Sequence, residues 1–215
     1  MTNLIELHIF TNSTNSAPST KLIENTFKSF CRTFNDSLNV TVWCDIHPNI
    51  EASSRYIENL KKIFNIINET TSLSDGYSKA IKNSSADFLF MLEHDWVFNN
   101  NIKHSLNTIL EVMLKDDLLH LRFNKRANVG KKFDKGIREI NNQKMSYCIT
   151  PGISNNPHII QRKKYIEVAL PLINIREKSF GIEKELSNSD LLGAIYGPLN
   201  YPGTITHVDG KNFRE

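Results

Sequence analysis

The amino-acid sequence predicts a single α/β domain with a mostly parallel central sheet flanked by helices. Residues 86–98, ADFLFMLEHDWVF, carry this prediction, because the apolar run from Phe88 to Leu92 is typical of a strand buried on both faces. Strand-like and helix-like segments alternate before it, as they do in parallel sheets. The run ends in the polar residues 93–95, at the edge where open α/β sheets bind their ligands.

The first half of the chain repeats the order strand, helix, strand, helix, strand. We expect strands at residues 4–10, 39–44 and 64–67, and helices at residues 21–34 and 53–64. A helical stretch at 71–85 then leads into the buried strand. This order predicts right-handed crossovers between parallel strands.

The second half of the chain is less regular. We expect helices at residues 102–114, 162–169 and 191–196, and strands at residues 118–123, 147–150, 158–160 and in the tail up to His207. Residues 124–143 are basic and weakly periodic. We interpret them as a loop that is mobile or becomes ordered when a ligand binds.

Length and composition narrow the class of protein. A chain of 215 residues without a Pro/Gly/Ser-rich linker fits one domain over residues 1–215, which can also be the first module of a longer polypeptide. The net charge of +3 comes from scattered Lys and Arg, which argues against a nucleic-acid-binding protein. No apolar stretch resembles a membrane span or a signal peptide. The 3 cysteines are widely spaced and indicate neither a disulfide framework nor a zinc site, so we expect a reducing, cytoplasmic location.

Residues 76–98, GYSKAIKNSSADFLFMLEHDWVF, resemble the core of nucleotide-sugar glycosyltransferases of the GT-A fold, with a likeness to family 2. In that family a Gly-containing helix precedes an apolar strand that ends in an acidic DxD signature. The corresponding residues here are Glu93-His94-Asp95, which depart from the signature at its first position. The resemblance implies transfer of a sugar from a nucleotide-diphosphate donor, with a UDP-sugar as the expected donor, to a hydroxyl of a glycan or glycoprotein, with inversion at the anomeric carbon.

The departing diphosphate of such a donor needs its growing charge neutralised, most simply by Mg²⁺ or Mn²⁺. We expect Asp95 to hold this metal, and Glu93, on the same face of an extended strand, to contact the ribose or a metal-bound water. His94 is expected on the opposite face. The resemblance also implies that His207 is a further ligand, which suits Mn²⁺ better than Mg²⁺. The alternatives are a solvated polar turn at 93–95 and an ordinary surface histidine.

The resemblance places the nucleotide at the ends of the first two strands. Thr11 and Asn12 follow the first strand, and Asp45 follows the second, where the family's acidic residue reads the imide of the base. A turn residue before His47 is the alternative for Asp45.

The next candidates lie at the start of the 71–85 helix. In the family this segment approaches the nucleotide, so Gly76 would permit a close backbone approach and Lys79 would reach a phosphate. Asp75 belongs to the same group, and a simple helix cap is the alternative. A basic flap over the diphosphate, or a solvated loop, is expected from the cations Arg122, Lys125, Arg126, Lys131 and Lys132.

An inverting transfer also needs a base that deprotonates the acceptor hydroxyl. The resemblance implies an acid some way after the metal motif, at the start of a helix. Glu183 is the first choice, and Glu185 and Asp190 stay open as alternatives. Each of these acids can equally belong to a solvated helix face.

Two other functions compete with this hypothesis. A sugar nucleotidyltransferase also uses carboxylates and Mg²⁺, but residues 11–20 lack the Gly-rich phosphate loop that it would normally carry. A nucleotide-sugar-binding or carbohydrate-binding module without catalysis is favoured by Glu93 in place of the first Asp.

Overall fold

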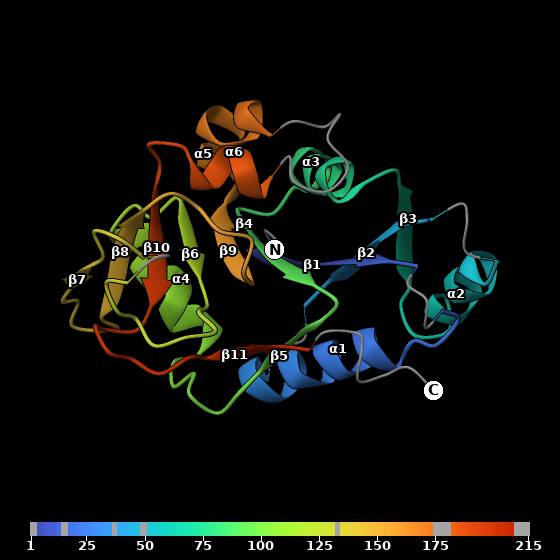
Figure 1. Ribbon diagram of the computed structural model, residues 1–215, viewed down its shortest axis with the longest axis horizontal. Coiled ribbons are helices and arrows are strands. Elements are labelled where there is room, and N and C mark those ends of the chain that lie inside the picture. The colour runs from blue at the N-terminus through green and yellow to red at the C-terminus, as the bar shows by residue number, and fades with distance from the viewer. Residues whose placement is uncertain are drawn as a thin grey trace.

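The computed structural model describes residues 4–13, 17–35, 38–47, 51–131, 134–173 and 182–208. Within these residues a nine-stranded sheet has the order β3-β2-β1-β4-β9-β6-β10-β8-β7, and a small second sheet has the order β11-β5 (Figure 1). In the large sheet β8 and β9 run opposite to the other strands. The predicted α/β fold with a mostly parallel sheet is therefore confirmed.

The strands of the large sheet are β1 (Ile5–Asn12), β2 (Val40–Asp45), β3 (Ile66–Thr70), β4 (Phe88–Glu93), β6 (His120–Arg122), β7 (Arg138–Ile140), β8 (Tyr147–Pro151), β9 (His158–Gln161) and β10 (Leu192–Tyr196). The small sheet consists of β5 (Trp96–Phe98) and β11 (Ile205–His207). The helices are α1 (Lys21–Phe34), α2 (Ser53–Leu60), α3 (Leu73–Asn83), α4 (Leu106–Lys115), α5 (Arg162–Val168) and α6 (Glu183–Ser187), with a 3₁₀ turn at Leu170–Leu172.

Helices cover both faces of the large sheet. The helices α1, α2 and α4 share one buried apolar cluster with the sheet, and α3, α5 and α6 share another on the opposite face (Figure 1). Local chemistry starts two of these helices, since the hydroxyls of Ser72 and Ser105 accept hydrogen bonds from backbone N–H groups in the first turns of α3 and α4. The apolar residues of β4 are buried throughout, as the sequence predicts for a central strand.

The predicted helix at 191–196 is wrong, because Leu192–Tyr196 forms strand β10. This strand pairs parallel with β6 and antiparallel with β8, so residues 193–196 are buried on both faces. A short apolar run without alternation fits a buried strand and a buried helix equally well, and only the neighbouring strands decide between them.

Residues 124–143, which we interpret as a loop that is mobile or becomes ordered when a ligand binds, include a short strand and contacts that anchor them to the domain. The segment contains β7, and Arg122 forms a buried ion pair with Asp134 inside it. The side-chain amide of Asn128 donates to the carbonyl oxygens of Tyr196 and Gly197, at 2.9 and 3.0 Å. Buried polar groups that are satisfied in this way anchor a segment to the domain.

The small sheet joins the end of the described chain to the residues that follow β4. His207 lies opposite Trp96, and Ile205 lies opposite Phe98, in an antiparallel pair. The last strand expected at His207 is thus present, and its partner is the segment directly after residues 93–95.

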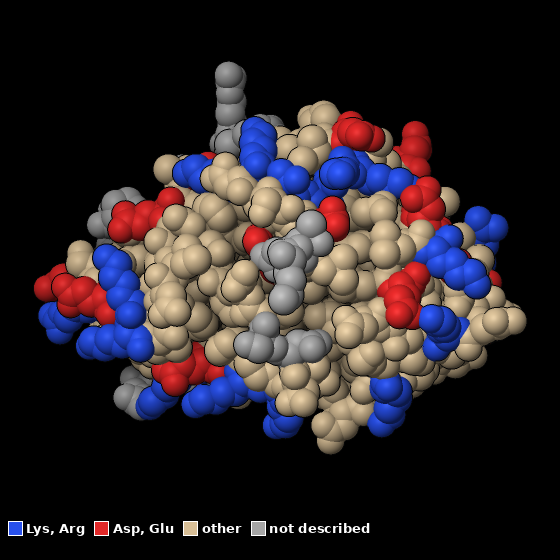
Figure 2. All heavy atoms as spheres, turned by 180° about the vertical axis from the view of Figure 1, so that it is seen from behind, with Lys and Arg blue, Asp and Glu red and all other residues tan. Residues whose placement is uncertain are grey.

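Among the described helices, none combines the length and the apolar composition that crossing a bilayer requires. On the face seen in Figure 2, Lys and Arg side chains are interspersed with Asp and Glu. This distribution agrees with the scattered charge of the sequence.

Candidate functional site

A cleft of about 320 Å³ lies at the carboxyl ends of β1, β2 and β4. It combines apolar and polar side chains, which is typical of ligand sites at this edge of an α/β sheet. The residues that line it are Phe10, Thr11, Asn12, Trp43, Asp45, His47, Thr70, Ser72, Leu73, Glu93 and His94.

Residues Asn12, Asp45 and Thr70 form an outer row of the cleft, one from each of three neighbouring strands. Asp45 of β2 lies opposite Asn12 of β1 on one side and opposite Thr70 of β3 on the other. The backbone N–H of Ser13 donates to the carbonyl of Asp45 at 3.1 Å, and the Ser13 hydroxyl accepts from the N–H of His47 at 3.1 Å. The loops after β1 and β2 are therefore bonded to each other, and the predicted residues Asn12 and Asp45 are brought together.

The inner row supplies an apolar floor with one carboxylate. Phe10, two residues before Asn12 on β1, lies opposite Trp43 of β2 on one side and opposite Glu93 of β4 on the other. The ring of Phe10 stacks on Tyr77 of α3 with centroids 4.1 Å apart, which holds the floor against the helix. Phe10 and Trp43 are additional site residues that were not predicted. Strand alternation puts them on the same face as Asn12 and Asp45, and the register of β1 with β2 sets the two pairs side by side.

Thr11 faces away from the predicted ligand side of β1. Its hydroxyl shares a hydrogen bond of 2.7 Å with the Tyr56 hydroxyl of α2, and its side chain is almost fully buried. Thr11 lines the cleft, but this contact occupies its hydroxyl on the opposite face of the sheet. Strand alternation explains the difference between Thr11 and Asn12.

The end of β3 reaches the cleft through Thr70, and the start of α3 reaches it through Ser72 and Leu73. The predicted residues Asp75, Gly76 and Lys79 are not among the residues that line it. This part of the site begins a few residues earlier in the chain than predicted.

Asp75 and Lys79 form an ion pair of 2.7 Å along the helix. Burial would raise the pKa of Asp75, but hydrogen bonds from Lys79 and Thr71 outweigh this effect and lower it. A Cβ on Gly76 would lie 3.3 Å from the Phe10 ring and 3.5 Å from Cβ of Trp43. Gly76 therefore allows α3 to pack closely on the floor of the cleft.

Glu93 and His94 both line the cleft. The strand β4 ends at Glu93, and residues 94–95 form a turn in which strand alternation no longer applies. Burial lowers the pKa of His94, the charge of Asp95 opposes this effect, and His207 adds to it. These three side chains are close enough to influence one another electrostatically.

Asp95 pairs with His207, as the sequence hypothesis of a shared site requires. Nε2 of His207 lies 2.8 Å from Oδ2 of Asp95, and the backbone N–H of Val208 donates to the Asp95 carbonyl at 2.7 Å. The Trp96 ring lies against the His207 ring with centroids 4.4 Å apart. The other carboxylate oxygen, Oδ1 of Asp95, is buried and has no hydrogen-bond partner among the described residues.

A divalent cation fits this pair in part. A buried carboxylate oxygen without a partner is costly unless a bound ion or water satisfies it. Among the described residues, however, no three His, Cys, Asp or Glu side chains converge on one point. Asp95 and His207 would thus hold a cation together with oxygens from a bound ligand or from water, as Mg²⁺ sites commonly do.

The three candidate bases lie in or beside α6. Glu183 begins this helix, and its side chain lies outside the described residues. Glu185 and Asp190 are exposed. The helix is attached to the sheet by Leu186, whose carbonyl accepts from the N–H of Ile153 at 3.0 Å.

The cations of the predicted basic flap differ in burial and in their partners. Arg122 is buried in its ion pair with Asp134. Lys125 is exposed, with its Nζ 5.6 Å from the centroid of the Trp96 ring. Lys125 therefore lies against Trp96, which follows Asp95 in the sequence and lies opposite His207 in the small sheet. Lys132 lies outside the described residues.

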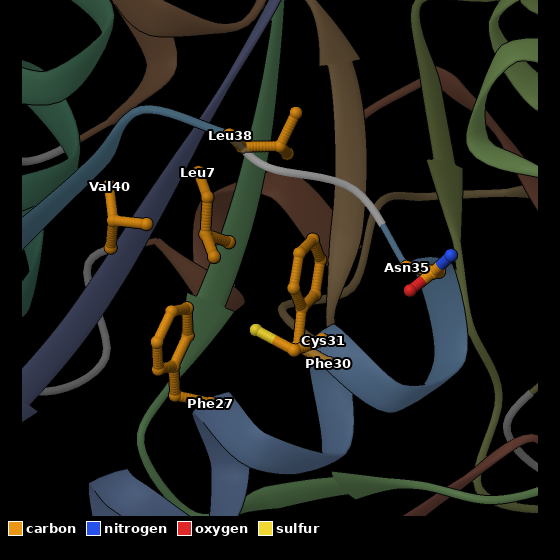
Figure 3. A pocket seen from close by; sticks show the side chains of 7 residues that line it. All are labelled: Leu7, Phe27, Phe30, Cys31, Asn35, Leu38 and Val40. Atoms are coloured by element: carbon orange, nitrogen blue, oxygen red, sulfur yellow. The ribbon is translucent and has the colours of Figure 1, made fainter.

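A second cavity, of about 350 Å³, lies beside α1 and the starts of β1 and β2 (Figure 3). Its walls are mainly apolar, with Leu7, Phe27 and Phe30 among the side chains shown. Burial raises the pKa of Cys31 there, so its thiol is a poor nucleophile. This cavity lacks the convergent polar groups of the cleft, which we take as the functional site.

No family model and no curated protein matches this sequence. The fold resembles the crystal structure of Staphylococcus aureus TarS 1-349, with a TM-score of 0.57 at 11% identity over 97% of this chain and 62% of that chain. A longer TarS structure has a TM-score of 0.57 at 13% identity, covering 97% of this chain and 38% of that chain. TarS 1-349 in complex with UDP gives 0.57 and 13%, covering 97% and 62%. This chain thus spans less than two thirds of these structures, and the likeness concerns the GT-A-type fold alone.

Proposed function

We propose that this protein is a glycosyltransferase that uses a nucleotide-diphosphate sugar, with UDP-sugars as the donor class. One observation carries the proposal: Asn12, Asp45 and Glu93 meet over an apolar floor in a cleft at the carboxyl edge of a GT-A-type sheet. The same fold occurs in TarS, which has been solved with UDP and with UDP-GlcNAc.

The cleft offers a different contact to each part of a uridine nucleotide. The carboxylate of Asp45 can accept a hydrogen bond from the imide N–H of uracil. The side-chain amide of Asn12 can donate a hydrogen bond to an exocyclic oxygen of the same base. Phe10 and Trp43 provide apolar surface for the flat base or the ribose. Glu93 can accept hydrogen bonds from ribose hydroxyls.

The diphosphate would lie toward Asp95 and His207. A bound Mn²⁺ or Mg²⁺ would neutralise the charge that develops on the leaving diphosphate. Asp95 and His207 would hold this cation, and Trp96 keeps the imidazole in place. Lys125 adds a positive charge beside this pair, with its Nζ 5.6 Å from the centroid of the Trp96 ring.

In the proposed reaction an acceptor hydroxyl of a glycan or glycoprotein attacks the anomeric carbon. The bond from that carbon to the diphosphate oxygen breaks, and a carboxylate takes the proton of the hydroxyl. We assign this base to Glu183, Glu185 or Asp190, because the resemblance implies an acid at the start of a helix some way after residues 93–95. Direct displacement of this kind inverts the anomeric configuration.

A binding module without catalysis is the second candidate. It is favoured because none of the residues that line the cleft in the described chain comes from α6. Such a module would bind the nucleotide sugar through Asp45 and Asn12 and would leave it intact.

Thermal shifts with UDP, GDP, CMP and UDP-GlcNAc, each with and without Mn²⁺, test the proposed donor site. We expect the uridine nucleotides to stabilise the protein, by about 2.7 kcal/mol at 100 times the dissociation constant. Asp45→Asn should abolish the preference for uridine. Asp87→Asn is the matched control, because Asp87 is exposed just before the amino end of β4.

Hydrolysis of UDP-GlcNAc separates the two candidates. A glycosyltransferase releases UDP slowly even without its acceptor, whereas a pure binding module does not. If no nucleotide stabilises the wild-type protein under any condition, the proposed donor site is wrong.

A further inference from the structure

Trp43 has a polar partner beneath the floor of the cleft. Its indole Nε1–H donates to Nδ1 of His8 at 2.9 Å, in a hydrogen bond that is buried at both ends. His8 precedes Phe10 by two residues on β1 and thus points to the same face of the sheet. The exposed fraction is 5% for Trp43 and 3% for His8. The bond reaches from the floor of the cleft into the interior of the domain.

The chain of polar groups continues beyond His8. Nε2 of His8 lies 3.4 Å from a carboxylate oxygen of Glu6, and the hydroxyl of Ser84 donates to the same oxygen at 2.6 Å. The Ser84 hydroxyl in turn accepts from the N–H of Ala86 at 3.0 Å. The indole of Trp43 is thereby linked through His8 and Glu6 to the end of α3.

The positions of the protons follow from these contacts. Because the Trp43 N–H donates to Nδ1 of His8, that nitrogen carries a lone pair. The proton of the neutral ring is therefore on Nε2, which faces Glu6. The carboxylate of Glu6 lies on the side of this protonated nitrogen, although Nε2 makes no hydrogen bond among the described residues.

The rest of the Trp43 side chain is confined by α3. Gly76 brings the helix so close that an added Cβ would lie 3.5 Å from Cβ of Trp43. The base of the side chain is thus fixed by packing and its tip by the hydrogen bond to His8. A phenylalanine would fill apolar space here without requiring a buried imidazole and a half-buried carboxylate, which are costly to desolvate.

We propose that His8 is a positioning residue, which sets the orientation of the Trp43 ring in the floor of the nucleotide cleft. The inference rests on the proposed function, since it takes UDP as the ligand of that cleft. Trp43 acts on the ligand directly, and His8 acts only through Trp43. Glu6 lies beside the protonated nitrogen of the His8 tautomer that this requires.

A double-mutant cycle with UDP as the probe tests the coupling. Calorimetric titrations would compare the wild type with His8→Leu, Trp43→Phe and the double variant, in the presence of Mn²⁺. We expect His8→Leu to weaken UDP binding about five- to tenfold, the value of one hydrogen bond. In the Trp43→Phe background the same change should have almost no effect on UDP affinity, because the donor is gone.

Two further variants control this cycle. His8→Gln keeps a side-chain acceptor and should restore most of the affinity. Ile109→Val makes a small core change in α4, which packs on the opposite face of the sheet, and should leave UDP binding unchanged. Additive effects of His8→Leu and Trp43→Phe would overturn the proposal, as would equal losses in His8→Leu and His8→Gln.

The indole N–H signals give an independent readout that does not depend on UDP. The chain has 2 tryptophans, so Trp96→Phe assigns the resonance of Trp43. We expect this resonance to shift strongly in His8→Leu and to return toward its wild-type position in His8→Gln. An unchanged Trp43 resonance in a folded His8→Leu would contradict the inference. Absence of UDP binding in the wild type would instead contradict the proposed function.

Discussion

His207 and Asp95 are 112 residues apart in the sequence, and Nε2 of one lies 2.8 Å from Oδ2 of the other. The pairing of β5 with β11 creates this contact, because it sets His207 opposite Trp96, the residue after Asp95. The contact leaves Oδ1 of Asp95 buried and without a hydrogen-bond partner in the part of the chain that the structure describes. A carboxylate in this state is suited to hold a cation.

If the pair holds a cation, Asp95→Ala and His207→Ala should both weaken the Mn²⁺-dependent part of UDP binding, by more than about tenfold. Titration of Mn²⁺ at fixed UDP measures this effect. Asp87→Ala, at the other end of β4, serves as the control. An Asp95→Ala protein with the wild-type dependence on Mn²⁺ would show that the cation, if any, binds elsewhere.

The search for the catalytic base requires Glu183→Gln, Glu185→Gln and Asp190→Asn. One of these variants should transfer sugar roughly 100- to 10,000-fold more slowly than the wild type, because proton removal from the acceptor is lost. Its affinity for UDP should be unchanged. Three variants with normal transfer rates would exclude the acids in and beside α6 as the base.

The stability of the fold should decrease in mild acid because of His158. Burial lowers the pKa of His158 to about 4, with a smaller contribution from Arg122, whereas the ordinary value is 6.5. The unfolded chain therefore binds the proton first, and the free energy of unfolding falls from pH 6.5 to about 4 and no further below. The loss from this group is about 3 kcal/mol.

Denaturant unfolding of the wild type and His158→Gln between pH 8 and pH 4 measures this contribution. The variant should have a flatter pH dependence, although the neighbouring buried His120 leaves a remaining slope. Identical slopes in the two proteins would contradict the assignment.

Gly152 should tolerate no side chain. Its φ is +80°, and an added Cβ would lie 2.5 Å from the carbonyl oxygen of Ser187 in α6. We expect Gly152→Ala to lower the free energy of unfolding by at least about 2 kcal/mol, since backbone strain and a steric clash combine. The variant should also shift α6 and thereby slow sugar transfer.

Gly136→Ala is the matched comparison for this prediction. Gly136 also has a positive φ, of +76°, but its added Cβ would meet only ordinary contacts, the nearest at 3.6 Å. The free energy of unfolding of Gly136→Ala should fall by about 1 kcal/mol, because only the left-handed backbone conformation is unfavourable there. Equal losses of unfolding free energy at the two glycines would show that contact with α6 is unimportant.

Local patterns in the sequence were sufficient for the first half of the fold. The order of β1, α1, β2, α2 and β3 follows from alternation and helical period, which depend on neighbouring residues. The resemblance to nucleotide-sugar glycosyltransferases implies that Asn12, Asp45 and Glu93 contact one nucleotide, and these three residues line one cleft. The helix predicted at 191–196 was wrong because its burial depends on β6 and β8, which are distant in the chain.

The sequence by itself determined the class of fold, the edge that carries the site and the polar residues at the ends of β1, β2 and β4. Only the tertiary structure decided the partners of the residues at this edge: the Thr11 hydroxyl bonds to Tyr56 of α2, and Trp43 in the cleft bonds to His8. It also brought His207 to Asp95. The physical reason is register, because strand pairing across the sheet sets which distant residues become neighbours, and no local period encodes that pairing.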